Sequence, residues 1–160
     1  MARLCPPDFT ILDTSGRENA KGCYYISTTR QNWENAKFEC ESKNAKLISV
    51  ESFTEKKYVL EYLLTLHYLH IQSVKVDTTS DVRYEYWTSG SDMIQEAKWL
   101  WGRSRKRVGD VGWLRERKPE SDTENCLSWS IILKTVSQVK EGWVSSWCQK
   151  KLLYICELNL

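Results

Sequence analysis

Apolar residues recur at steps of three and four in two stretches of the first half of the chain. In the first stretch, Trp33, Ala36 and Cys40 share one helical face. Asn32 stands where a side chain caps the first turn, and Asn44 stands where a left-handed residue ends a helix. The pattern predicts a short helix with one face against a core.

The second stretch begins after a short apolar run at 47–50, which predicts a strand or a bend. Ser52 and Glu55 have the spacing of a capping box. An apolar stripe at helical spacing follows, made of Tyr58, Val59, Tyr62, Leu63 and Leu66. Such a stripe is far more often core than a ligand groove, so it predicts a second helix packed on the core.

Short apolar or alternating runs in the rest of the chain predict strands. They lie at 23–27, 84–87, 99–101, 127–133 and 152–158. Residues 102–124 carry heavy charge without periodicity and are interpreted as a long loop. At 160 residues the chain is expected to form one domain, residues 1–160.

Six cysteines, without any Cys-x-x-Cys spacing, favour three disulfides and a secreted, extracellular protein over a zinc site. Six free thiols in a cytosolic protein are the alternative. No apolar run approaches the roughly 20 residues of a membrane span. No secretory signal is evident, and Met1-Ala2 is interpreted as the start of a trimmed mature form.

Positive charge is concentrated in residues 103–118. The cations there are Arg103, Arg105, Lys106, Arg107, Arg115, Arg117 and Lys118. Seven cations against Asp110 and Glu116 give +5, whereas the whole chain carries only +2, so the remainder sums to −3.

A focused positive loop attracts anions. Trp99, Trp101 and Trp113 flank the cations and are expected to offer stacking faces. The loop therefore predicts an anionic glycan, a lipid head group or an acidic protein surface as partner. A loop that is merely solvated and a dibasic processing site at 103–107 are the alternatives.

Other chemistry has little support. His67 and His70 have a spacing that could bind a metal on a helix, but no acidic residue or cysteine joins them at ligand spacing. No nucleophile–base arrangement is present, and Glu120, Asp122 and Glu124 form no evident acid–base pair, so no enzyme is predicted. Secretory disulfides argue against nucleic acid as a partner.

Three blocks of residues, in order, resemble the C-type lectin-like domain family over nearly the whole chain. The first runs from Trp33 through Cys40 to Glu55, and the second is Trp87-Thr88-Ser89-Gly90, a variant similar to invertebrate members. The third comprises Cys126, Trp143, Cys148 and Tyr154-Ile155-Cys156-Glu157. The resemblance implies an α+β fold with two helices flanking small antiparallel sheets, a long loop region at 102–124 and three disulfides.

The resemblance also selects one cysteine pairing. It implies Cys40–Cys156, Cys126–Cys148 and, as in long-form members, a Cys5–Cys23 bond across an N-terminal hairpin at 1–27. This pairing leaves no cysteine for a bond between two chains, so any dimer would be non-covalent.

Sugar-binding members of the family hold calcium with carboxylate and amide oxygens, and this chain departs from that set. Lys118-Pro119-Glu120 stands at the triplet position, and Val144 and Ser145 replace the Asn-Asp pair. Glu120 and Glu124 are the residual candidate ligands, fewer than the six to eight oxygens that calcium takes. No cofactor is therefore expected, and a calcium-dependent lectin with an atypical site is the alternative.

Overall fold

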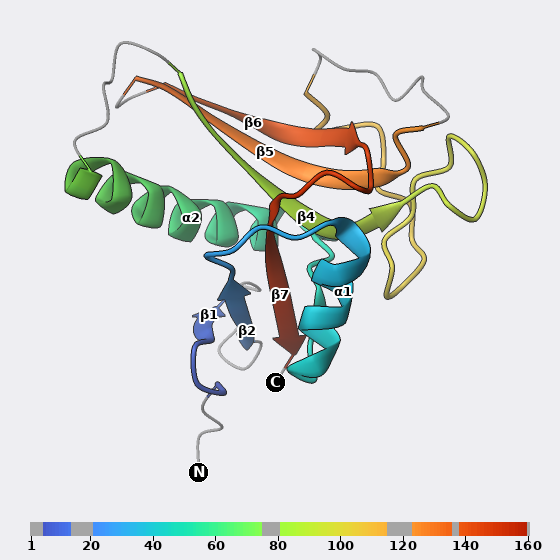
Figure 1. Ribbon diagram of the computed structural model, residues 1–160, viewed down its shortest axis with the longest axis horizontal. Helices are drawn as coiled ribbons and strands as arrows, with labels where there is room; N and C mark the ends of the chain where they lie inside the picture. Colours follow the sequence, from blue (N-terminus) through green and yellow to red (C-terminus); the bar gives the residue numbers. More distant parts are fainter. Residues whose placement is uncertain (1–4, 14–20, 75–80, 115–122, 136–137, 160) are drawn as a thin grey trace.

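The computed structural model describes residues 5–13, 21–74, 81–114, 123–135 and 138–159. Within these ranges the chain forms two helices, both in its first half, and seven strands (Figure 1). They are β1 (Thr10–Asp13), β2 (Lys21–Ile26), α1 (Trp33–Ser42), β3 (Lys46–Leu47), α2 (Phe53–Val74), β4 (Val82–Ser91), β5 (Cys126–Thr135), β6 (Gln138–Ser146) and β7 (Leu153–Asn159). The predicted α+β class is confirmed.

Helix α1 begins and ends at the residues that the sequence indicates. The Asn32 side chain accepts a hydrogen bond from the Asn35 amide at 2.8 Å. Asn44 follows the last turn with φ 59°, in the left-handed region. Trp33, Ala36 and Cys40 are the buried residues of the helix, so the predicted apolar face is confirmed.

Helix α2 is longer than its apolar stripe. Ser52 Oγ accepts from the Glu55 amide at 3.0 Å, and Val59 and Leu63 are fully buried. Tyr58, predicted as core, is exposed, because it lies at the solvent edge of the stripe. The helix continues past His67, whose ring is buried and stacks on Tyr84.

His67 therefore belongs to the core. Its Nε2 atom lies 3.2 Å from the Tyr86 hydroxyl, which fits a satisfied buried imidazole. The side chain of His70 lies outside the described residues. Within the described ranges, no group of three His, Cys, Asp or Glu side chains is placed to hold a metal ion.

The strands form one mixed sheet in the order β1-β2-β7-β4-β5-β6, with β3 also paired to β7. All pairings are antiparallel except β4 with β7, which is parallel at Tyr86–Leu153 and Trp87–Tyr154. The predicted antiparallel sheets are thus joined by one parallel pairing. Strand β7 is covered on both faces, because Ile155 belongs to the main core while Tyr154 and Cys156 pack in a second cluster with residues of α1, so all three are buried.

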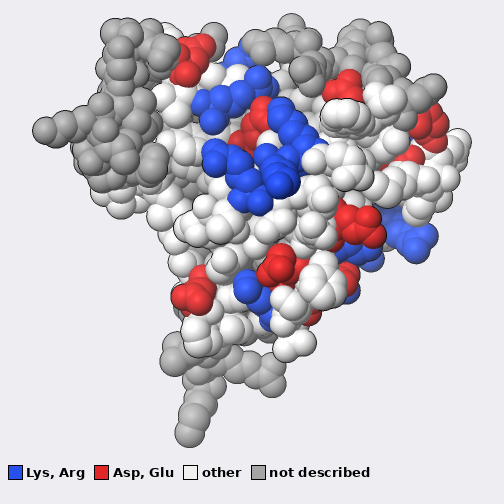
Figure 2. All heavy atoms as spheres, in the orientation of Figure 1, with Lys and Arg blue, Asp and Glu red and all other residues white. Residues whose placement is uncertain are grey.

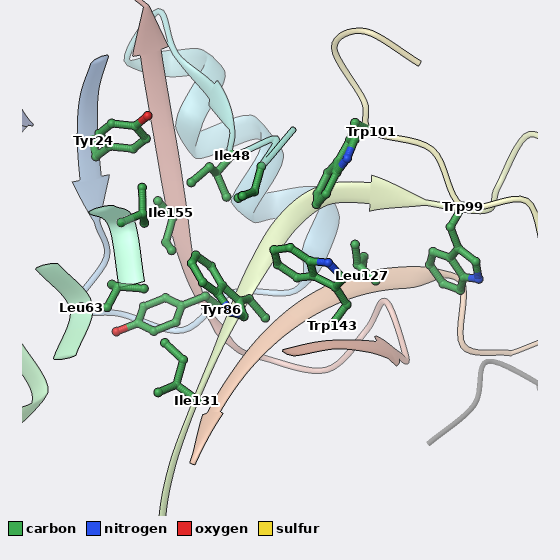
Figure 3. Close-up of a cluster of buried hydrophobic side chains, with 13 residues drawn as sticks. Tyr24, Ile48, Leu63, Tyr86, Trp99, Trp101, Leu127, Ile131, Trp143 and Ile155 are labelled. Carbon is green, nitrogen blue, oxygen red and sulfur yellow. The ribbon is translucent and has the colours of Figure 1, made fainter. Parts of the chain in front are cut away.

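The main core lies between α2 and the sheet (Figure 3). Tryptophan rings fill its end beneath the loop region. Trp143 packs against Trp101 and Trp129, with ring centroids 5.3 and 5.2 Å apart. The first pair is edge-to-face and the second is tilted, and such packing of large rings stabilises this end of the core.

The three predicted disulfides are all present. Cys40–Cys156 ties α1 to β7, Cys126–Cys148 joins β5 to the segment after β6, and Cys5–Cys23 fastens the chain before β1 to β2. Cys40–Cys156 closes the longest loop, with a sequence separation of 116. On the chain-entropy model it contributes about 5 kcal/mol to stability.

Candidate functional site

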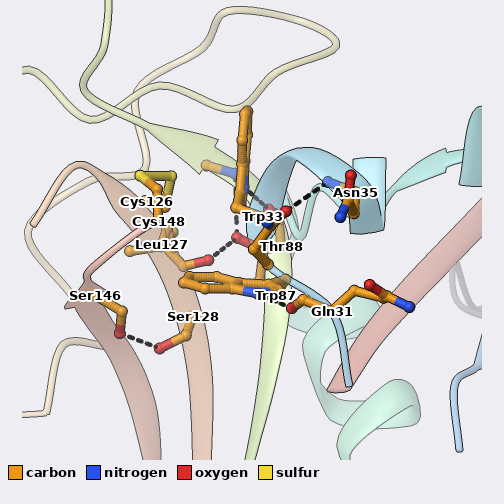
Figure 4. The surroundings of a disulfide bond; sticks show 12 residues. Gln31, Trp33, Asn35, Trp87, Thr88, Cys126, Leu127, Ser128, Ser146 and Cys148 are labelled. Atoms are coloured by element: carbon orange, nitrogen blue, oxygen red, sulfur yellow. Dashed lines mark hydrogen bonds between the residues drawn. A yellow bond between two sulfur atoms is a disulfide. The ribbon is translucent and has the colours of Figure 1, made fainter. Parts of the chain in front are cut away.

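The long loop region leaves and re-enters the sheet at adjacent positions. Strand β4 ends at Ser91, which is paired with Cys126 at the start of β5, and Cys126 is paired with Ser146 at the end of β6. The disulfide from Cys126 to Cys148 closes this row, and the Cys148 carbonyl accepts from the Trp33 amide at 2.9 Å (Figure 4). The base of the loop is therefore covalently fixed to the sheet and hydrogen-bonded to α1.

Serine hydroxyls fix the first part of the loop as well. The Oγ atoms of Ser49 and Ser89 lie 2.6 Å apart, and Ser89 Oγ accepts from the Gly102 amide at 3.0 Å. Further out, Ser104 Oγ donates to Glu51 Oε1 at 2.6 Å. These bonds hold the loop against the bend that precedes α2.

The segment from Trp99 to Val108 folds back on itself. The Trp101 amide donates to the Lys106 carbonyl at 2.9 Å, and the Val108 amide donates to the Trp99 carbonyl at 3.0 Å. Trp99 and Trp101 alternate into the core as predicted, but the backbone forms only isolated bridges there. Their exposed fractions are 7% and 2%, so the expectation that these two rings offer stacking faces is wrong.

Trp113 differs from these two. It is half-buried, packs edge-on against Trp99 at 5.5 Å between ring centroids, and donates through Nε1 to the Gly109 carbonyl at 2.8 Å. Part of its ring remains accessible beside the loop. Burying the large rings of Trp99 and Trp101 removes apolar surface from water and stabilises this part of the loop.

The cations of the loop lie at the tip of this folded segment. Arg103, Arg105, Lys106 and Arg107 are all exposed, and Arg105 has a left-handed backbone with φ 59°. Within the described ranges none of the four side chains forms an ion pair. Arg115, Arg117 and Lys118 lie outside the described residues.

The positions that hold calcium in sugar-binding relatives are filled differently. Val144 and Ser145 are 4% and 0% exposed and lie within the pairing of β6 with β5. The Val144 carbonyl accepts from Ser128 Oγ at 3.2 Å. A buried isopropyl group and a buried hydroxyl do not fit calcium, which takes several anionic oxygens from an open site. Glu124 is half-buried, and Glu120 lies outside the described residues.

Two buried carboxyls beneath the loop were not found from the sequence. Glu157 is 4% exposed and accepts from the Ser49 amide at 2.8 Å, and Glu55 accepts from the Tyr24 hydroxyl at 3.2 Å. Burial, then repulsion from Glu55, raises the pKa of Glu157 to about 8, with the Arg103 guanidinium opposing the change. Burial likewise raises the pKa of Glu55 to about 7.

A second cluster of cations was also missed. Glu85, on β4, forms ion pairs with Arg83 at 2.9 Å and with Lys150 at 3.3 Å. Lys150 is 65 positions away in the sequence, so no local charge pattern could have revealed this cluster. Glu55 and Glu157 could not be paired from the sequence for the same reason, because α2 and β7 bring together residues that are about 100 positions apart in the chain.

Residues 29–158 match the lectin C-type domain family, and the chain belongs to this family. It is 25% identical to mouse (Mus musculus) CD209 antigen-like protein D over 159 residues, which cover 98% of this chain and 53% of that protein. The chain spans about half to two thirds of the length of the first curated relatives it matches.

Solved structures share the fold. The human scavenger receptor C-type lectin carbohydrate-recognition domain superposes with a TM-score of 0.66 at 18% identity, covering 98% of this chain and 100% of that one. A calcium-independent type II antifreeze protein gives 0.66 at 19% identity, with 100% and 98% covered. The described helices include none that is long and apolar enough to cross a membrane.

Proposed function

We propose that this C-type lectin-like domain binds an anionic partner, foremost an acidic glycan, through the exposed cations of its long loop and without calcium. The observation that best supports this proposal is that four cations close together in the sequence are exposed at the tip of the loop, namely Arg103, Arg105, Lys106 and Arg107. The base of the loop is fixed by the hydrogen bonds of Ser49 and Ser89 and by the Cys126–Cys148 disulfide. A fixed positive surface lowers the entropy cost of binding and attracts anions over a distance.

The chemistry of the partner follows from the fold and the charge together. Similar proteins are described as lectins or carbohydrate-recognition domains, which supports a glycan over a lipid head group or an acidic protein surface. Neutral sugars are usually held by this family through calcium, and the buried Val144 and Ser145 do not favour that route. Sulfate or carboxylate groups give arginine and lysine side chains a direct, charge-assisted contact.

Two properties support an extracellular binding module rather than an enzyme. All six cysteines are paired, which favours an oxidising location. The family consists of binding modules, and one protein of the same fold is described as calcium-independent. Secretion and the absence of catalysis remain part of the proposal.

A charge-removal variant tests the proposed surface. Replacing Arg105, Lys106 and Arg107 with alanine is expected to lower the salt concentration that elutes the protein from immobilised heparin, because exposed charges act through screened electrostatics. In a matched variant, Lys37, Lys43 and Lys46 are replaced by alanine. This removes the same charge from a different part of the surface, on α1 and just after it. If both variants elute alike, the loop has no special role.

The alternative, a calcium-dependent lectin with an atypical site, is tested separately. Calcium at 100 times its dissociation constant would stabilise the domain by about 2.7 kcal/mol. For a domain of this size that corresponds to a rise in Tm of roughly 5–10 °C. We expect the Tm to be the same in calcium and in chelator. A rise of that size would replace the proposal with the alternative.

A further inference from the structure

The turn that follows β6 presents a large aromatic ring beside a lysine. Trp147 is 63% exposed, and its carbonyl accepts from the Lys150 amide at 2.9 Å. Cys148, inside the turn, is fixed by its disulfide to Cys126 and by the hydrogen bond from the Trp33 amide. The ring and the lysine are therefore held by a rigid segment rather than by a free loop.

Cations from other parts of the chain gather beside this turn. Glu85 holds Arg83 and Lys150 through its two carboxylate oxygens, yet the side chains of these cations remain 42% and 51% exposed. Arg30 and Lys151 are also exposed and belong to the two segments that bridge beside β4. Figure 2 shows Lys and Arg atoms gathered around a small acidic group on this face of the molecule.

We propose that Trp147, Arg83, Lys150 and Lys151, here called the turn surface, bind a linear sulfated glycan. The apolar face of a sugar ring packs on the Trp147 ring, and sulfate groups contact the cations. One exposed aromatic side chain alone would be unremarkable. Its place in the same turn as Lys150, whose ammonium pairs with Glu85 as Arg83 does, is what fits a ligand that combines apolar ring faces with closely spaced anionic groups.

The ion pairs of Glu85 hold Arg83 and Lys150 in place for an anionic ligand, and their effect outweighs the repulsion between the Glu85 carboxylate and that ligand. They hold two flexible side chains in place, which reduces the rotamer entropy that binding would otherwise cost. Two cations contact this one carboxylate, and the exposed Arg30 and Lys151 stand next to the bridged residues Gln31 and Leu152, so this part of the surface keeps a positive excess. An acidic polypeptide would satisfy the charges but has no equivalent of the sugar face for the Trp147 ring.

The turn surface goes beyond the function proposed for the long loop, because different residues form it. Glu85 precedes the end of β4 at Ser91 by six positions, about 20 Å along an extended strand. A long polyanion can therefore engage both surfaces, and a short oligosaccharide can engage only one. Linked contacts of this kind raise the overall affinity far above that of either surface alone.

The test uses the domain with its disulfides intact and two immobilised probes, heparin and poly-L-glutamate. Two variants remove parts of the turn surface, Lys150→Gln with Lys151→Gln and, separately, Trp147→Ser. Matched controls are Lys43→Gln with Lys46→Gln, and Phe38→Ser. Lys46, like Lys150, is an ion-paired and exposed lysine, and Phe38 is an exposed aromatic with 66% accessibility.

We expect the double lysine variant to bind heparin roughly fivefold more weakly for each cation removed, and Trp147→Ser to bind about threefold more weakly. The controls should bind as the unaltered domain does, and near-ultraviolet circular dichroism verifies that each variant is folded. Unchanged heparin binding of both turn variants overturns the inference. Equal loss on poly-L-glutamate also overturns it, since the partner would then be an acidic polypeptide.

The loop variant at Arg105, Lys106 and Arg107 separates this inference from the proposed function. Loss of binding in the turn variants alone leaves the turn surface standing and refutes the loop. Loss in the loop variant alone does the reverse. With long heparin chains, combining the two sets should reduce affinity by more than either set does.

Discussion

Replacing Glu157 with glutamine should stabilise the domain at alkaline pH. Glu157 is 4% exposed, and its carboxylate oxygen accepts from the Ser49 amide. Glutamine has nearly the same shape, and its amide oxygen can accept the same hydrogen bond. The substitution therefore removes a charge from the interior while leaving the packing of β7 in place.

The magnitude follows from the raised pKa. Burial and the nearby Glu55 raise the pKa of Glu157 from 4.5 to about 8. Each pKa unit corresponds to about 1.4 kcal/mol, so the upper bound on the cost of charging Glu157 in the folded state is roughly 5 kcal/mol. Relaxation of the protein and water around the charge reduces the gain we expect to about 2–4 kcal/mol.

The pH dependence has a definite sign. Between pH 4.5 and about 8 the folded state binds more protons than the unfolded state, so the free energy of unfolding falls as the pH rises. Glu55, whose burial raises its pKa to about 7, adds to the fall in the same window. Glu157→Gln should remove much of the slope, and it should match the unaltered domain near pH 4, where the carboxyls are protonated.

Urea unfolding at intervals from pH 4 to pH 9, in chelator, measures both effects. Glu61→Gln, on the exposed side of α2, is the matched control and should change neither stability nor slope. The reasoning fails if the unaltered domain is equally stable at pH 5 and pH 9. It also fails if Glu157→Gln is less stable than the unaltered domain at pH 9.

Three further predictions concern the fold. Replacing Cys40 and Cys156 together with alanine should lower the free energy of unfolding by about 5 kcal/mol, measured by urea denaturation, because the bond constrains a long loop of the unfolded chain. Asn44→Gly should raise the urea midpoint and Asn44→Ala should lower it, since the residue has φ 59°. Gly90→Ala should lower Tm, with a cost of about 1–3 kcal/mol, because an added Cβ would lie 2.5 Å from Leu127 Cδ2. An unchanged Tm there would show that β5 adjusts freely.

Much of the fold follows from local patterns in the sequence. The caps at Asn32 and Asn44 depend on short-range backbone chemistry, which is why both ends of α1 were predicted correctly. The apolar faces of α1 and β5 depend on periodicity alone. The prediction that Tyr58 lies in the core is wrong, because the apolar stripe of α2 is wider than the surface that the helix buries against the sheet. Tyr58 lies at the edge of the stripe, in solvent, and periodicity does not show where the buried surface ends.

The candidate site depended more on tertiary structure. The sequence revealed the cations of the long loop because they are adjacent in the chain. It could not show that the Trp99 and Trp101 rings are buried, because a tryptophan next to a charged loop can either pack in the core or lie on the surface, and the sequence pattern is the same in both cases. The Glu85 cluster and the Glu55–Glu157 pair were invisible for a different reason, which is the large sequence separation between their members.

The sequence by itself determined the helices, most of the strands, the family and, through that family, the disulfide pairing, since each rests on residues at fixed local spacing. Only the tertiary structure decided which charged groups face each other. Ion pairs and buried carboxyls depend on distances of a few ångströms between distant segments, and the sheet order sets those distances.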